Sequence, residues 1–175
     1  MTYNQKLSAI AQGTVNGVLQ VVQTVKTDAF ASSFGGQWGD ITGFSASITP
    51  SSASNKILII IDAKFMGDTD VSVSRVRLMR DTTAIYLGDA SSNRPRSSGP
   101  QNYTTNAGSG GANVLGSGIT YLDSPSTTSQ ITYKLQGGGD GNSTLFFFNR
   151  SELDRDTTYY DTRTASSITL MEISS

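Results

Sequence analysis

Two pairs of aspartates with the spacing Asp-x-Asp are the residues of this sequence that most resemble a metal site. They are Asp68 with Asp70 and Asp154 with Asp156, and their carboxylate oxygens suit a hard cation such as calcium. A calcium ion takes about six to eight oxygens, usually from a loop with several spaced carboxylates. Neither pair stands in such a loop, so we interpret both as turn-capping or solvated surface acids and predict no metal and no other cofactor.

Acid–base catalysis is the second chemistry to consider. A glycosidase needs two facing carboxylates, for which Glu152 with Asp154 or Asp123 would be the obvious choice, although sequence spacing cannot establish their separation. The chain has no His and no Cys, and no Ser-x-x-Lys motif supplies a base for a serine nucleophile. The usual catalytic residues are missing, and we therefore predict that the protein is not an enzyme.

Aromatic side chains offer a binding chemistry instead. Four of them lie in or beside predicted loops, where ring faces could stack on sugars: Trp38, Tyr103, Tyr159 and Tyr160. The alternative, which we favour, is that these rings pack under loops or at contacts between subunits. Both hypotheses predict surface contacts rather than a catalytic site.

A long segment from Asp89 to Ala112 contains Ser, Asn, Gly, Pro and Arg without apolar periodicity. It exceeds the ~12 to 15 residues that are usual for an unstructured connection, so we interpret it as a loop that binds a partner or another subunit. Within it, Arg94 and Arg96 flank Pro95. These two arginines either pair with acidic groups of another subunit or are simply solvated.

The composition restricts the possible partners. Charged residues make up 15% of the 175 residues and the net charge is -1, so no long-range field attracts nucleic acid or an anionic membrane. No apolar run approaches the ~20 residues of a membrane-spanning helix. The start, Met1–Gln5, lacks the basic flank and apolar stretch of a signal peptide. We expect a protein that binds neither nucleic acid nor membrane and assembles in a cytoplasm.

Short runs rich in Val, Ile, Thr, Tyr and Phe predict strands, because helix formers such as Glu and Lys are scarce. The predicted strands are Val18–Val25, Ile41–Thr49, Lys56–Met66, Ala84–Gly88, Gly118–Leu122, Gln130–Gln136, Thr144–Asn149 and Ser167–Ile173. Another runs through Val71 to Leu78, where the alternation slips by one residue at Arg75, which indicates a bulge or a change of partner strand. Gly137–Gly141 is predicted to form a hairpin turn.

About eight or nine strands at this spacing predict an all-β, antiparallel, jelly-roll-like sandwich. The sandwich domain is expected to span residues 18–175 as one unit. Its core should contain the apolar residues that alternate along the central strands: Ile57, Ile59, Ile61, Leu78, Ile131, Tyr133 and Leu135.

The first seventeen residues stand apart as a short extended N-terminal arm. Gly13, Asn16 and Gly17 would interrupt any helix begun at Leu7. Little apolar area is available within the arm to offset the entropy of ordering it. We therefore expect the arm to lie on a partner, with its few larger apolar side chains as the anchor: Leu7, Ile10 and Val15.

Several segments of the sequence resemble a module of tailed phages of aquatic bacteria, which is often labelled tail-fibre-like. They are Val18–Lys26 (VLQVVQTVK), Ser45–Leu58 (SASITPSSASNKIL), Leu78–Asp89 (LMRDTTAIYLGD), Tyr121–Pro125 (YLDSP), Asn149–Ser151 (NRS) and Ser167–Ile173 (SITLMEI). The resemblance covers most of the chain after Val18. It implies a β-sandwich on the virion surface that forms homotrimers and is assembled in the host bacterial cytoplasm.

Two functions are compatible with this resemblance. In the first, the protein decorates or cements the capsid, with its arm laid over neighbouring capsid subunits. In the second, it is a tail-fibre module that binds a host-surface glycan through loop aromatics. The chain has a short arm where fibre modules usually follow a long shaft, so we favour the first. A glycan-degrading virion enzyme is a third, weaker alternative.

Overall fold

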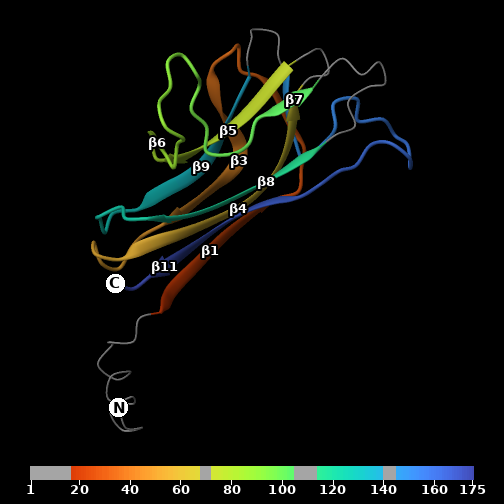
Figure 1. The fold of residues 1–175 in the computed structure, drawn as a ribbon. Helices are drawn as coiled ribbons and strands as arrows, with labels where there is room; N and C mark the ends of the chain where they lie inside the picture. The colour runs from red at the N-terminus through yellow and green to blue at the C-terminus, as the bar shows by residue number, and fades with distance from the viewer. Residues whose placement is uncertain (1–16, 68–71, 105–113, 140–144) are drawn as a thin grey trace, which may run out of the picture.

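The computed structural model describes residues 17–67, 72–104, 114–139 and 145–175. They form two antiparallel sheets that stack as the two layers of a sandwich (Figure 1). Sheet A contains β1 (Val18–Lys26), β2 (Phe30–Ser33), β4 (Lys56–Gly67), β8 (Leu115–Asp123), β10 (Leu145–Phe148) and β11 (Ser166–Ile173). Sheet B contains β3 (Trp38–Ile48), β5 (Ser72–Arg80), β6 (Thr83–Ile85), β7 (Asn102–Thr104) and β9 (Ile131–Gly138).

The strand pairs are nested along the chain. The first strand, β1, pairs with the last, β11; β3 then pairs with β9, β4 with β8, and β5 with β6, all antiparallel. The chain is thus a long hairpin whose successive pairs fall alternately in sheet A and sheet B, which is the arrangement of a jelly roll. The predicted jelly-roll-like antiparallel sandwich is confirmed.

The core lies between the sheets and follows from the alternation of strand residues. On β4, Ile57, Ile59 and Ile61 are buried, and they meet Leu78 of β5 and the inward side chains of β9 in one cluster. All seven predicted core residues are buried members of this cluster: Ile57, Ile59, Ile61, Leu78, Ile131, Tyr133 and Leu135.

Some predicted boundaries are wrong. Phe30–Ser33 is not among the predicted strands but forms β2, which pairs with β10, and the predicted Asp89–Ala112 loop contains the short strand β7. The apparent slip at Arg75 is no bulge, because the register of β5 with β9 is continuous and Ser74 occupies the inward position. The partner strand does change there, from β7 to β9.

The predicted hairpin turn at Gly137–Gly141 is also misplaced, because Gly137 and Gly138 belong to β9. A Cβ on Gly137 would stand 2.8 Å from the Phe34 ring, and one on Gly138 would stand 2.8 Å from the Trp38 ring. The two glycines therefore leave room for aromatic rings that close this end of the sandwich.

Several predictions fall outside the described residues. They concern the arm apart from Gly17, with Leu7, Ile10 and Val15, and the pair Asp68 and Asp70. In the part of the chain that the structure describes, no helix is long and apolar enough to cross a membrane.

Candidate functional site

The most distinctive surface feature is a segment that interrupts a strand. Strands β10 and β11 both pair with β4, Phe148 beside Phe65 and Ser167 beside Asp62, so they occupy successive stretches of that strand. The chain leaves sheet A after Phe148 and returns to it at Ser166. We call residues 149–165 the excursion. Figure 1 shows it at one end of the sandwich, opposite the end where the C-terminus lies.

Asn149 fixes the base of the excursion. Its side-chain amide donates to the carbonyl oxygens of Lys26 at 2.8 Å and Asp28 at 3.3 Å, and its Oδ1 accepts from the Ser166 hydroxyl at 2.6 Å. Its backbone N–H donates to the Lys64 carbonyl oxygen, and its backbone carbonyl accepts from Thr164. Asn149 is fully buried at a φ of 59°, a left-handed conformation that Asn tolerates better than most residues. One buried side chain thus joins both ends of the excursion to the end of β1 and the residues just after it.

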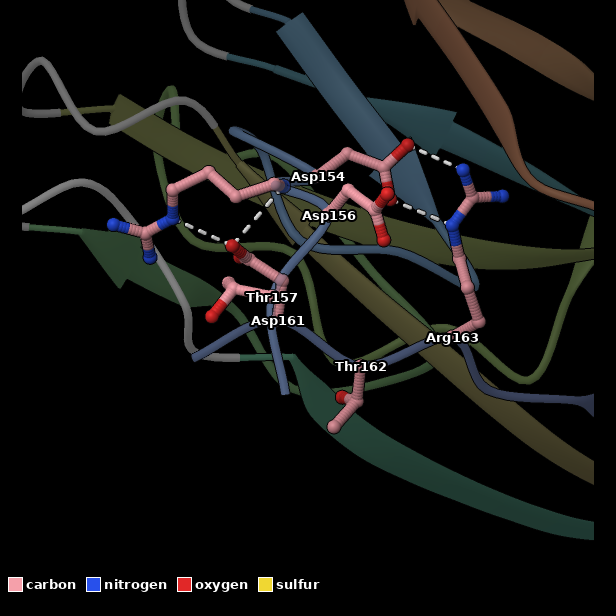
Figure 2. A pocket seen from close by; sticks show the side chains of 7 residues that line it. Asp154, Asp156, Thr157, Asp161, Thr162 and Arg163 are labelled. Carbon is pink, nitrogen blue, oxygen red and sulfur yellow. Dashed lines mark hydrogen bonds and ion pairs between the residues drawn. The ribbon is translucent and has the colours of Figure 1, made fainter. Parts of the chain in front are cut away.

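Two sets of ion pairs brace the excursion above its base (Figure 2). Arg163 donates to both carboxylate oxygens of Asp154, and Arg150 lies 3.6 Å from the same carboxylate. Asp161 accepts from the Arg155 guanidinium at 2.6 Å and from the Ser151 hydroxyl at 2.5 Å. These two donors hold the pKa of Asp161 below its ordinary value. The carboxylates of Asp154 and Asp161 therefore hold the shape of the loop.

Two tyrosines project from this braced loop. Tyr159 is 85% exposed and Tyr160 is 65% exposed, and their ring centroids lie 6.4 Å apart. The Arg155 guanidinium lies 5.0 Å from the centre of the Tyr160 ring, so the ion pair of Arg155 also orients this tyrosine. Large exposed rings on a fixed loop can contact a sugar ring or another protein with little loss of conformational entropy.

A polar hollow of about 360 Å³ lies in the same loop (Figure 2). Its walls are hydroxyl, carboxylate and guanidinium side chains: Asp154, Arg155, Asp156, Thr157, Asp161, Thr162 and Arg163. Such groups suit the hydroxyls of a carbohydrate better than an apolar ligand. Among the described residues, no group of three or more His, Cys, Asp or Glu side chains is arranged to hold a metal ion.

The structure places the other proposed contact residues on separate elements. Trp38 lies in β3 rather than in a loop, and the Arg77 guanidinium covers its ring at 4.6 Å. Tyr103 is exposed on β7. Arg94 donates to the Ser91 hydroxyl and Arg96 to the Gly88 carbonyl, so each arginine bonds its own loop. Only the neighbouring tyrosines 159 and 160 are brought together among these predicted residues.

Two buried carboxylates stand elsewhere, each satisfied by its surroundings. Asp123 of β8 accepts from the Tyr133 hydroxyl at 2.7 Å and forms an ion pair with Arg80 at 3.0 Å, which links sheet A to sheet B. Burial and the bond to Asp123 raise the pKa of Tyr133 far above its ordinary value. Asp123 is thus a structural link, and the candidate catalytic pair of Glu152 with Asp123 gains no support.

Glu172 of β11 is the second buried carboxylate. It accepts from the Asn55 amide at 2.6 Å, the Gln20 amide at 2.6 Å, and the Ser51 backbone and hydroxyl at 2.7 and 2.8 Å. Burial acts to raise the pKa of Glu172, but these hydrogen bonds outweigh it and lower the pKa to about 2. An ionised carboxylate held by neutral donors is a structural element, because a general acid needs a raised pKa.

Sequence reasoning found the tyrosines and Asp154 but missed the residues that fix them, namely Asn149, Ser151, Arg155, Asp161 and Arg163. A signal was present, since half of the residues from 150 to 163 are charged, against 15% for the whole chain. In a chain with so few charges, such a segment indicates an internally ion-paired loop.

No protein-family model matches the sequence, and a search of curated proteins finds no match. Solved structures with similarity include infectious bursal disease virus, Gx strain, at 12% identity and a TM-score of 0.42, with 91% of this chain and 42% of that chain covered. A D431N mutant VP2 protein of the same virus, in T=1 particles, has 12% identity, a TM-score of 0.38, and coverage of 88% and 40%. The chain spans about two fifths of the length of each of these proteins.

Proposed function

We propose that this chain is a structural protein of a tailed-phage virion. In this proposal it forms a homotrimeric surface β-sandwich that decorates or cements the capsid and is anchored by its N-terminal arm, residues 1–17. The sequence segments that resemble the phage module support the virion role. The jelly-roll fold is compatible with it and does not by itself define a function.

The observation that carries a structural rather than an enzymatic role is the state of the carboxylates. Glu172 is held by neutral donors, Asp123 by Tyr133 and Arg80, and Asp161 by Arg155 and Ser151. The carboxyl pKa shifts resolved among the described residues are all downward. Glu172, Asp123 and Asp161 serve to hold strands and loops, and the four acids with a lowered pKa, Asp28, Asp40, Asp161 and Glu172, are not tuned to donate a proton at neutral pH.

Particle assembly tests this function. A version that lacks residues 1–17 should remain folded and trimeric but should no longer join the particle, and gold-labelled antibody should locate the parent protein on the capsid. If the truncated protein is incorporated at the normal level, the arm is not the anchor. If the label sits on the tail, capsid decoration is wrong.

The excursion favours a second candidate function, binding of a host-surface glycan by a tail-fibre module. Its two exposed tyrosines stand on a loop braced by ion pairs and buried hydrogen bonds, beside a polar hollow. Aromatic faces with adjacent hydroxyl and carboxylate groups are a suitable surface for a sugar ring. Such a site would work by binding alone.

Adsorption to intact host cells tests this second function. The purified protein should bind the cells, binding should fall after periodate oxidation of surface sugars, and the double variant Tyr159→Ala, Tyr160→Ala should bind at least ~tenfold more weakly. Tyr103→Ala, an exposed tyrosine on β7, is the matched control and should bind like the parent. Equal binding by the double variant and the parent would contradict a role for the excursion.

A further inference from the structure

The outer face of sheet A carries an aliphatic row that crosses four strands. Val21 of β1 pairs with Met171 of β11, Met171 with Leu58 of β4, and Leu58 with Leu122 of β8. Val21 is 56% exposed and Leu122 is 45% exposed, so the row reaches solvent at both edges. Side chains at paired positions project on the same side of a sheet.

The next row on this face is uncharged as well. It contains Gln23, Thr169, Ile60 and Thr120, paired in that order across the same four strands. Charge returns on β4 only beyond these rows, at Lys56 on one side and Asp62 on the other. We call the eight residues of the two rows the neutral face.

The outer face of sheet B has the opposite character. Asp40 of β3 accepts from Lys134 at 2.6 Å and from Gln136 at 2.7 Å, and Gln136 in turn accepts from Arg77 of β5. Arg77 covers Trp38, which completes a continuous network of charged and polar contacts. This network is satisfied within one chain and needs no partner.

We propose that the neutral face of sheet A is the surface on which two copies of this chain contact each other. A partner that brought charges to this face would bury them without counter-ions, which is costly. The described residues offer two sheet faces that could pack on the neutral face of another copy. The outer face of sheet B would bring the charges of Asp40, Lys134 and Arg77 into the contact, whereas a second neutral face would bring no charge. The neutral face is therefore its own best complement, and two such sheets can pack with their strands within about 30° of each other.

The area of the neutral face limits how tightly two copies can associate. Four strands about 4.8 Å apart and two outward rows, which span about four residues of 3.3 Å each, give a patch of roughly 250 Å². A stable protein interface buries about 800 Å² per partner. The neutral face supplies about a third of that area, so we expect a weak association, with a Kd in the micromolar range or above. Packing of one neutral face on another joins two copies by a two-fold contact, so it is distinct from the contact that would form the proposed trimer. This inference does not depend on the virion role.

Oligomeric mass is the first test, measured on the full chain by light scattering at a concentration on the order of 100 μM, well above a micromolar Kd. The parent should give more than the 18.5 kDa of one chain and about twice the mass of the variants of the neutral face. Ile60→Glu and Leu122→Glu should weaken the association about a hundredfold or more, because each buries an uncompensated carboxylate. Ser45→Glu, at an exposed position on sheet B beside Lys134, is the matched control and should keep the parent mass.

Crosslinking keeps the proposal falsifiable if a glutamate variant fails to fold. The chain has no Cys, so Thr120→Cys and Ser45→Cys each introduce a single thiol at an exposed strand position. A short bismaleimide should join copies through Thr120→Cys and not through Ser45→Cys. A monomeric parent, face variants with the parent mass, or crosslinking only through the Ser45 position would each overturn the proposal. Monomers that bind purified capsids would assign the face to another virion protein and overturn it too.

Discussion

Sheet A and sheet B follow the same strand alternation but present opposite chemistry to the outside. Sheet B turns Asp40, Lys134 and Arg77 outward in a closed network, whereas sheet A turns Val21, Leu58 and Leu122 outward. Sheet A also turns its carboxylate Glu172 inward, where neutral donors hold it. Alternation alone therefore identifies a strand, while the chemistry of the outward positions distinguishes a charged face with its own bonds from an uncharged, partly apolar one.

The largest expected effect compares two neighbours on β4. Ile59 is fully buried and Ile60 is 37% exposed on the outer face. Ile59→Ala should lower the free energy of unfolding by about 2 to 5 kcal/mol, because it leaves a cavity in the core. Ile60→Ala, the matched control, should lower it by less than about 1 kcal/mol. Urea denaturation of both variants checks this, and equal losses would mean that the two faces of β4 are assigned wrongly.

The inward carboxylate of sheet A should have the next largest effect. Glu172→Gln replaces one carboxylate oxygen by an amide NH₂, which cannot accept the buried hydrogen bonds from Asn55, Gln20 and Ser51. The free energy of unfolding at pH 7 should therefore fall by about 1 to 3 kcal/mol. Chemical denaturation of the parent and the variant measures the difference. A variant as stable as the parent would show that the donors are satisfied without the carboxylate.

The same carboxylate predicts an acid dependence. The pKa of Glu172 is about 2 in the folded protein, below its ordinary value of 4.5. Its contribution to stability is therefore complete above pH 4.5 and is lost as the pH falls toward 2. The stability difference between the parent and Glu172→Gln should shrink over this window. A difference that stays constant from pH 6 to pH 2 would contradict the lowered pKa.

The outward carboxylate of sheet B should matter less. Burial acts to raise the pKa of Asp40, but the bonds from Lys134 and Gln136 outweigh it and leave the pKa below its ordinary value. Because the side chain is half exposed, Asp40→Asn should cost only about 0.2 to 1 kcal/mol. The loss should diminish in high salt, which screens exposed charges. A loss larger than that of Glu172→Gln would reverse the comparison between the two sheets.

The smallest effect is expected on the neutral face itself. Leu122→Ser should change the stability of the isolated chain by less than about 0.5 kcal/mol, because the side chain is exposed there. Thermal unfolding at a low concentration, where copies do not associate, measures this. A large loss in the monomer would mean that Leu122 belongs to the fold rather than to a contact surface.

Much of the fold could be predicted from the local pattern of apolar residues in the sequence. The apolar residues that alternate along Lys56–Met66 identified a central strand, and its predicted core residues Ile57, Ile59 and Ile61 are buried. Strand β2 was missed because Phe30–Ser33 is short and half polar, and its identity depends on β10, which is more than a hundred residues away. Pairing at that distance leaves no local signal.

Only some residues of the candidate site could be predicted from the sequence, for a related reason. Exposed tyrosines in a polar segment indicate a loop, so Tyr159 and Tyr160 could be selected from the sequence. Asn149 could not, because its role requires the carbonyl groups of Lys26 and Asp28 from the other end of the chain. Asn149–Ser151 is one of the segments that resemble the phage module. The structure gives a physical reason for Asn at position 149, because its amide bonds Lys26, Asp28 and Ser166 at once.

The nested pairing of strands also determines when the protein can fold. During synthesis, β4 is complete at residue 67, yet its neighbours β8, β10 and β11 begin only at residues 115, 145 and 166. The last pairing, β1 with β11, must wait for residue 173. A nascent chain of this kind holds its most apolar strand without its sheet A neighbours until β8 is complete at residue 123, and association with other chains is a hazard during that interval. Slow, post-translational closure is the kinetic cost of joining the two ends of the chain in one sheet.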